Sequence, residues 1–243
     1  MEIEVHADPV SLSAHASATI ALAARVAIGA RARFLLAVSG GNTPLETLRR
    51  LATETIDWQQ VHLAQVDERV APSGSDERNL THLQAMLLDR VPLPRTHVHS
   101  MPVEDIDISA GAQRFARQLE QIAGRPATFD MMLLGLGADG HTASLVPGDP
   151  VLDSSAAEVA LTEVYRGARR MTLTFPIINR ARCVVWLIAG ASKAPALAQL
   201  IHRDLSIPAS HVARERALLL VDRAAFAASS AQRLPADVSV VEH

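Results

Sequence analysis

The sequence predicts an α/β fold in which a doubly wound, mostly parallel sheet carries helices on both faces. Short apolar runs typical of buried strands alternate with longer segments of helical spacing along most of the chain. Hydrophobic residues make up 49% of the 243 residues and aromatic residues only 3%, so we expect a large core of Ala, Val, Leu and Ile. No internal repeat, low-complexity tract or convincing linker interrupts the pattern, which favours one domain over residues 1–243.

The individual elements follow from apolar spacing and from residues that start or stop helices. We expect strands over 3–5, 33–38, 61–66, 131–134, 170–175, 182–189 and 217–221, and helices over 9–28, 44–52, 79–90, 109–123 and 191–203. Gly29 is placed to end the first helix. Thr43 is a suitable N-cap for the second, with Pro44 at its first position and Glu46 at its third. Asp222 would cap a short last helix.

Composition argues against several classes of function. The net charge is -3 and no basic patch stands out, so we expect no binding of nucleic acid. The single cysteine, Cys183, cannot form an internal disulfide, and its apolar surroundings favour an inert buried thiol. The N-terminus lacks a basic region followed by an apolar stretch, and no apolar run approaches about 18 residues. We therefore expect a cytoplasmic protein with no membrane span.

The segment 130–144 is the most informative part of the chain. An apolar run ends in Gly135, Gly137 and Gly140, and Asp139 and His141 follow at what would be the carboxyl end of a strand. Ligands of open α/β sheets bind at that end. Glycine allows a sharp turn and a close approach of backbone to ligand, and histidine suits proton transfer near neutral pH. The segment is therefore interpreted as a catalytic loop; the alternative is a surface loop histidine.

The same three glycines also match the dinucleotide-binding pattern G-x-G-x-x-G. That pattern needs a helix beginning inside it and a second strand that ends in an acidic residue about 20 residues later. Pro147, Gly148 and Pro150 would stop any helix after about two turns. The residues that follow, 153–158, are small and polar and do not resemble a strand end. We therefore reject a dinucleotide site.

A second strand-end loop has the features of an anion site. Ser39, Gly40, Gly41, Asn42 and Thr43 lie between a buried strand and a helix start. Backbone N–H groups at a helix N-terminus attract phosphate, and the hydroxyl groups can add donors. The G-K-[ST] ending of a Walker A loop is absent. A phosphate cradle is the favoured interpretation, with an ordinary capped turn as the alternative.

Charged residues follow two further strands. Asp67 and Arg69 come directly after the strand at 61–66, and a forked guanidinium suits a phosphate or a developing oxyanion. Lys193, the only lysine, falls in the first turn of an expected helix, where a cation opposes the helix dipole unless it meets an anion. Arg170 could reach the same ligand. The alternative for all four residues is a solvated surface position.

Two other chemistries find no support. The G-x-S-x-G turn of α/β-hydrolases is absent. His97 and His99 are accompanied neither by an H-E-x-x-H motif nor by a set of cysteines, so we expect no metal site. These two histidines are expected to flank a short strand.

Taken together, these segments resemble the 6-phosphogluconolactonases over nearly the whole chain. The matching elements are SGGNTP at 39–44, DERV at 67–70, Asn79, GLGADGHTAS at 135–144, RMTLT at 170–174 and GASKA at 190–194. The resemblance implies a Rossmann-like α/β fold similar to that of the glucosamine-6-phosphate deaminases, which share the Gly-Gly-x-Thr-Pro loop and an Asp-Gly-His segment.

Two features distinguish the chain from those deaminases. They carry Asp-Glu-Tyr where this chain has Arg69 as the third residue, and a glutamate shortly after the histidine where this chain has Thr142-Ala-Ser-Leu-Val146. A lactonase need not open a hemiacetal ring, so the loss of that carboxylate is chemically coherent. One departure from the lactonases is Arg78, where they usually have Ser; a changed affinity is expected if that neighbourhood contacts the substrate.

The resemblance implies hydrolysis of 6-phosphoglucono-δ-lactone to 6-phosphogluconate in the oxidative pentose phosphate pathway, with neither metal nor cofactor. His141 would act as the general base, Asp139 would orient it or the water, and Arg69 would stabilise the oxyanion. The residues expected to contact the substrate or its phosphate are Ser39, Gly40, Gly41, Asn42, Thr43, Asp67, Gly137, Arg170 and Lys193.

Two alternative functions and one unknown are left open. A glucosamine-6-phosphate deaminase-like isomerase is the first alternative, and a non-enzymatic sugar-phosphate sensor is the second. Such sensors usually carry a DNA-binding segment, for which this chain has neither spare length nor basic character. The partner is expected to be a small molecule, not a nucleic acid or a membrane. The sequence does not reveal the oligomeric state, although a monomer is slightly favoured.

Overall fold

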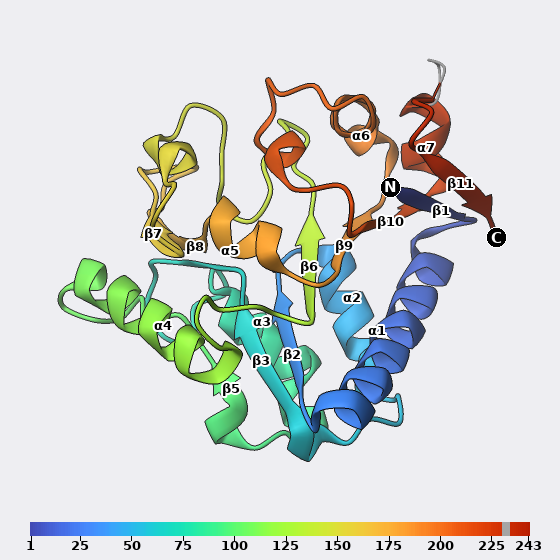
Figure 1. Ribbon diagram of the computed structural model, residues 1–243. Helices are drawn as coiled ribbons and strands as arrows, with labels where there is room; N and C mark the ends of the chain where they lie inside the picture. The colour runs from blue at the N-terminus through green and yellow to red at the C-terminus, as the bar shows by residue number, and fades with distance from the viewer. Residues whose placement is uncertain (230–233) are drawn as a thin grey trace.

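A computed structural model describes residues 1–229 and 234–243 and shows a large, wholly parallel sheet (Figure 1). Among the described residues the sheet has eight strands in the order β11-β1-β10-β9-β6-β2-β3-β5. They are β1 (Glu2–His6), β2 (Phe34–Val38), β3 (Val61–Gln65), β5 (Val98–His99), β6 (Met131–Gly135), β9 (Val184–Ile188), β10 (Ala217–Asp222) and β11 (Ser239–Glu242). The predicted fold class is confirmed, although the edge strand β11 had not been predicted.

Helices cover both faces of this sheet because side chains alternate along each strand. In β2, Leu35 and Ala37 join one buried apolar cluster, whereas Phe34, Leu36 and Val38 join the other. The first cluster packs against α4 (Ile108–Ala123), α5 (Phe175–Arg180), α6 (Ala194–Ile201) and α7 (Arg223–Ser229). The second packs against α1 (Pro9–Arg31), α2 (Asn42–Leu51) and α3 (Asn79–Met86). The two clusters form the core on either side of the sheet.

A second, antiparallel sheet lies beside the large one. Its three strands are β4 (Asp67–Arg69), β8 (Arg170–Leu173) and β7 (Val159–Leu161), in the order β4-β8-β7. The strand expected over 170–175 therefore exists, but it belongs to a sheet that the alternating pattern had not predicted. Its register places Arg69 directly opposite Arg170, which brings together two arginines separated by a hundred residues of sequence.

Several helix boundaries differ from those predicted, among them the end of α1 and the start of α2. α1 continues through Gly29 to Arg31 and is followed by its C-cap Ala32, which takes the left-handed conformation with φ 55°. Thr43 is not an N-cap, because α2 begins one residue earlier, at Asn42. The preceding Gly41 makes the turn itself, with a φ of 105° that side chains disfavour. The helix N-terminus is thus closer to the end of β2 than the capping pattern suggested.

The first helix, α1, is strongly apolar, and part of its surface belongs to the core. By length and composition alone α1 could cross a membrane, a feature that the sequence analysis did not anticipate. However, 44% of its most apolar window is buried, including Leu12, Ala16 and Ile20. That face contacts β1, β2 and β10. Part of the apolar surface of the helix therefore packs against the sheet.

Candidate active site

A cavity of about 370 Å³ lies at the carboxyl ends of the neighbouring strands β2, β6 and β9. The antiparallel sheet supplies another part of its wall. The predicted site residues that line it are Ser39, Gly40, Gly41, Thr43, Asp67, Arg69, Gly137, His141, Arg170 and Lys193. Asn42 begins α2, but its side chain lies outside the described part of the structure. Segments that are far apart in sequence thus meet at one end of the sheet.

Asp139 and His141 form a hydrogen-bonded pair within the loop after β6. The Nδ1 atom of His141 lies 2.5 Å from Oδ1 of Asp139, and the hydroxyl of Tyr165 donates to Oδ2 of the same carboxylate at 2.6 Å. Asp139 itself does not line the cavity, whereas His141 does. Tyr165 was missed by the sequence analysis because it lies in the irregular segment between β7 and β8, where no periodicity marks it.

These contacts set the ionisation of Asp139 and the tautomer of His141. Burial acts to raise the pKa of Asp139, but the hydrogen bonds from Tyr165 and His141 outweigh it and lower the pKa to about 2. The carboxylate is therefore ionised at neutral pH and favours the imidazole tautomer that carries its proton on Nδ1. The Nε2 atom of His141 is then left unprotonated in the neutral ring. This arrangement suits a general base.

Two glycines of the loop allow this geometry. A Cβ atom on Gly137 would overlap the side chains of both Asp139 and His141. Gly140 has a φ of 80° and lies against Ile207, so a side chain there would be strained and blocked. The fully described segment between β6 and β7 contains no α-helix, only a short 3-10 turn. The glycines therefore shape the turn around the histidine, in agreement with our rejection of the dinucleotide pattern.

The cavity wall also carries unpaired donors. The hydroxyl oxygen of Ser39 and the Nε atom of Arg170 are buried and have no hydrogen-bond partner among the described residues. Gly41 precedes the N-terminus of α2, whose first backbone N–H groups have no partner within the helix. Lys193 ends a short 3-10 turn immediately before α6, rather than lying inside a longer helix as predicted. Together these groups form a region suited to an anion.

The buried carboxyl group of Asp67 forms another part of the cavity wall. It accepts a hydrogen bond from the hydroxyl of Ser144 at 2.6 Å and another from Nδ2 of Asn79 at 3.3 Å. Burial raises the pKa of Asp67, opposed by the Ser144 hydrogen bond and the nearby charge of Arg170. Ser144 belongs to the stretch in which the deaminases carry a glutamate. Here its hydroxyl fixes the carboxyl group of Asp67 on β4.

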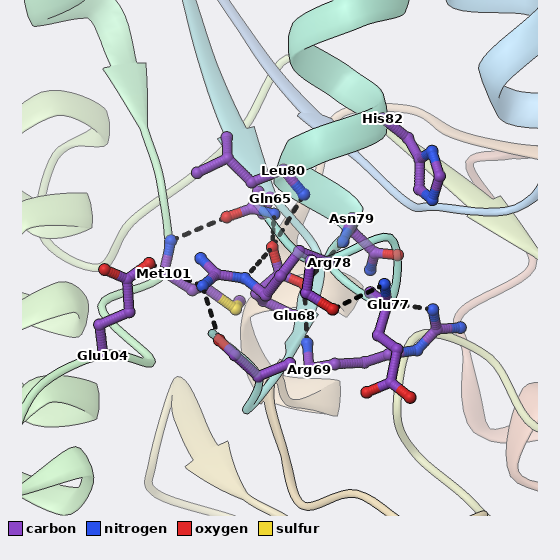
Figure 2. Close-up of polar contacts among 12 residues, drawn as sticks. Gln65, Glu68, Arg69, Glu77, Arg78, Asn79, Leu80, His82, Met101 and Glu104 are labelled. Carbon is purple, nitrogen blue, oxygen red and sulfur yellow. Dashed lines mark hydrogen bonds and ion pairs between the residues drawn. The ribbon is translucent and has the colours of Figure 1, made fainter. Parts of the chain in front are cut away.

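Glu68 holds the elements around this wall together (Figure 2). Its side chain is fully buried, so its charge must be compensated locally. It accepts hydrogen bonds of 2.8 Å from Nε2 of Gln65 and from the backbone N–H groups of Arg69, Asn79 and Leu80. Two of these donors are the first N–H groups of α3. One carboxylate therefore caps α3 and fixes β4 to it, which positions Asn79 and Arg69 at the cavity.

Arg78, the departure from the lactonase pattern, completes this network and does not line the cavity. Its Nε atom lies 3.1 Å from Glu68, and its Nη1 atom contacts Glu104 at 2.7 Å and the carbonyl oxygen of Ala71 at 3.0 Å (Figure 2). Only 3% of the side chain is exposed. The guanidinium therefore compensates the buried charge of Glu68, and the unusual residue has no direct contact with the cavity.

Comparisons with known proteins agree with this geometry. The family model for glucosamine-6-phosphate isomerases/6-phosphogluconolactonase matches residues 7–221. The chain belongs to this family. It is 38% identical to the 6-phosphogluconolactonase of Mycobacterium tuberculosis over 239 residues, which cover 93% of this chain and 97% of that protein.

Solved structures within this family share the fold. The 6-phosphogluconolactonase of Thermotoga maritima superimposes with a TM-score of 0.82 at 24% identity, over 91% of this chain and 99% of that one. A monomeric glucosamine-6-phosphate deaminase gives the same TM-score at 19% identity, over 94% and 100% of the two chains. The fold alone therefore does not distinguish the two activities, and the residues of the site must do so.

Proposed function

We propose that this chain hydrolyses 6-phosphoglucono-δ-lactone to 6-phosphogluconate in the oxidative pentose phosphate pathway. The observation that carries the proposal is the arrangement of the cavity. His141, which is suited to proton transfer through its hydrogen bond with Asp139, lines one part of it, and a glycine-rich, cationic region suited to phosphate forms another. The relatives that the chain matches over most of its length are named as 6-phosphogluconolactonases, which supports the same reaction.

The phosphate group would bind first and position the lactone. Backbone N–H groups of Gly40 and Gly41, the side chains of Ser39 and Lys193, and the buried guanidinium of Arg170 would contact it. Anchoring the phosphate places the carbonyl group at the other end of the sugar against the loop after β6. Much of the rate increase would come from this positioning.

His141 would then transfer protons in both steps of the hydrolysis. Its Nε2 atom removes a proton from water as the water oxygen bonds to the lactone carbonyl carbon. The tetrahedral intermediate carries negative charge on the former carbonyl oxygen, next to the Arg69 guanidinium. When the bond between this carbon and the ring oxygen breaks, Nε2 returns its proton to the ring oxygen. The product acid then ionises in solution.

The positions of Arg69 and Asp139 fit supporting roles in this scheme. The Nη1 atom of Arg69 donates to the carbonyl oxygen of Glu77 at 2.7 Å, which holds the side chain at the cavity wall. Asp139 would maintain the ring orientation and tautomer of His141 throughout. A lactone is already a reactive ester, so the scheme requires no covalent intermediate, metal or cofactor.

The cytoplasm is the compartment that this proposal assigns to the reaction. The substrate is a small, charged sugar phosphate. The apolar face of α1 packs in the core, which favours a protein that needs no membrane. The segment that follows His141 offers no carboxylate for the ring opening that a deaminase performs, so deamination is disfavoured despite the shared fold.

A comparison of two substrates tests the proposal. The lactone is generated in place by glucose-6-phosphate dehydrogenase, and 6-phosphogluconate is followed through its own dehydrogenase, with the uncatalysed rate subtracted. Ammonia release from glucosamine 6-phosphate is measured with the same protein. We expect clear acceleration with the lactone and none with the amino sugar. The opposite result would support a deaminase, and binding without turnover of either would support a sensor.

A further inference from the structure

Three histidines and a glutamate converge at the edge of the large sheet, away from the cavity. Glu4 and His6 lie on the same face of β1, His15 lies on α1, and His243 follows the edge strand β11. Figure 1 shows the C-terminus beside the junction of β1 and α1. The backbone N–H of His243 donates to the carbonyl oxygen of Val5 at 2.9 Å, which continues the pairing of β11 with β1.

The four side chains are directed at one another. From Oε2 of Glu4, the Nε2 atoms lie at 2.7 Å in His15, 3.2 Å in His243 and 3.8 Å in His6. One nitrogen or oxygen atom from each residue lies within 4.8 Å of all the others. In a tetrahedral zinc site with bonds of about 2.0–2.1 Å, neighbouring ligand atoms are about 3.3 Å apart. The three distances from Glu4 to the histidines lie on either side of this value, and the side chains of His15 and His243 are partly exposed.

One buried nitrogen of this cluster has no hydrogen bond. Nε2 of His6 is buried and has no hydrogen-bond partner among the described residues, whereas the buried Oε2 of Glu4 forms ion-pair contacts with His15 and His243. Buried polar atoms normally have a partner, so the unpaired nitrogen of His6 requires an explanation.

A second histidine cluster provides a contrast. His62, His97 and His99 lie near β3 and β5, with ring centroids 4.0 Å and 5.4 Å apart for the two pairs that include His62. Nδ1 of His62 contacts Nε2 of His99 at 3.1 Å, and Nδ1 of His99 contacts Gln118 at 3.0 Å. These nitrogens already have partners, and no carboxylate joins the group among the described residues. Packing and hydrogen bonding account for this second cluster.

We propose that Glu4, His6, His15 and His243 form a structural Zn²⁺ site that joins the two ends of the chain. Three imidazole nitrogens and one carboxylate oxygen are a donor set typical of zinc. Four protein ligands leave no open position for substrate, and none of the four residues lines the cavity. The ion would fasten β11, which pairs only with β1 among the described strands, to β1 and α1. This proposal departs from our sequence-based expectation of no metal and is independent of the proposed function.

Zinc titration of the full-length protein tests the site. Protein freed of metal with a chelator is titrated with ZnCl₂ in competition with a chromophoric chelator, and the bound ions are counted by native mass spectrometry. His15→Ala and His243→Ala each remove one partly exposed ligand, so they should leave the fold intact, as circular dichroism would verify. His97→Ala is the matched control in the other cluster.

We expect one zinc ion per wild-type chain and a loss of affinity of at least about a hundredfold in His15→Ala and His243→Ala. His97→Ala should bind as the wild type does. Zinc should also raise the Tm of the wild type and of His97→Ala but not of the two cluster variants. The proposal is overturned if wild-type protein binds no stoichiometric zinc, if the double variant of His15 and His243 binds it unchanged, or if His97→Ala removes the binding.

Discussion

The cavity at the centre of the large sheet and the cluster at its edge use the same side chains in different arrangements. In the cavity, a single histidine has one nitrogen bound to a carboxylate that Tyr165 also holds, so one nitrogen of His141 remains for the substrate. At the edge, three histidines surround one carboxylate, and the buried Nε2 atom of His6 has no hydrogen-bond partner among the described residues. The residue type is the same in both regions. The contacts of each ring nitrogen therefore distinguish the candidate general base from the candidate metal ligands.

The difference also concerns how each group is supported. The Asp139–His141 pair lies within one short loop, and buried hydrogen bonds from neighbouring strands fix the cavity around it. The edge cluster depends on the pairing of β11 with β1, so it forms only when both ends of the chain are in place. We therefore expect substitutions in the two regions to have separable effects, on catalysis in one case and on stability and metal binding in the other.

Among the substitutions that leave His141 in place, the largest effect is expected from Asp139→Asn, compared with Glu4→Gln. Both changes replace a carboxylate beside histidine by an amide. Asp139→Asn should lower kcat roughly thirtyfold with little change in KM, because the amide cannot enforce the Nδ1-protonated tautomer of His141. Glu4→Gln should leave kcat unchanged. Steady-state kinetics of both variants test this prediction. An equal fall of kcat in Asp139→Asn and Glu4→Gln would contradict the expected functional difference between the cavity and the edge cluster.

Lys193→Ala should raise KM about tenfold while kcat stays within about twofold, because the lysine would contact the phosphate equally in ground state and transition state. Arg95→Ala, which removes one exposed positive charge outside the cavity, is the control for a general electrostatic effect. An unchanged KM in Lys193→Ala, or an equal rise in the control, would exclude Lys193 from the phosphate site.

The buried His99 should make stability depend on pH. Burial, and then the charges of His62 and His97, lowers the pKa of His99 from 6.5 to about 4. As the pH falls below 6.5, His99 becomes protonated in the unfolded chain, whereas in the folded chain it stays neutral until about pH 4. The free energy of unfolding therefore decreases as the pH falls from 6.5 to about 4. Between pH 7 and pH 5.5 this residue should account for about 1 kcal/mol of the unfolding free energy.

Urea unfolding at these two pH values, for wild type and His99→Asn, measures that contribution. The variant should lose less stability than the wild type on acidification, by about the stated amount. Identical losses in the two proteins would show that His99 does not carry the effect.

The smallest effect is expected from Tyr165→Phe. The change removes one of the hydrogen bonds that lower the pKa of Asp139 but keeps the ring that lies beneath Arg170, at 5.0 Å. We expect kcat to fall about threefold with KM nearly constant, because Asp139 stays ionised and only its position is less well fixed. Kinetics at neutral pH provide the measurement. A loss as large as that of Asp139→Asn would mean that Tyr165 contacts the reacting atoms.

The strand-end loops were predictable because their signals are local. Gly40, Gly137, His141 and Lys193 each follow a buried apolar run within a few residues, and parallel strands bring such loops to one edge. Their presence at the cavity was therefore foreseen, whereas their roles in binding and catalysis remain predictions. The parallel sheet was predictable for the same reason, since alternating apolar runs and helical segments define it.

The contacts that were missed depend on long-range pairing. Nothing near Tyr165 marks it as a partner of Asp139, and the pairing of Arg69 with Arg170 requires a second sheet that the alternating pattern does not encode. The approach of His243 to β1 depends on an edge strand that was not recognised. Cys183 was expected to be buried and is only partly so, although burial still raises the pKa of its thiol.

The most direct test of this account is lactone hydrolysis by wild type, His141→Ala and His15→Ala measured side by side against the uncatalysed rate. We predict equal acceleration by wild type and His15→Ala, and a kcat lower by about a hundredfold or more in His141→Ala with phosphate-ester binding retained. Turnover by His141→Ala at the wild-type rate would contradict the assignment of the base and, with it, the contrast between the two regions.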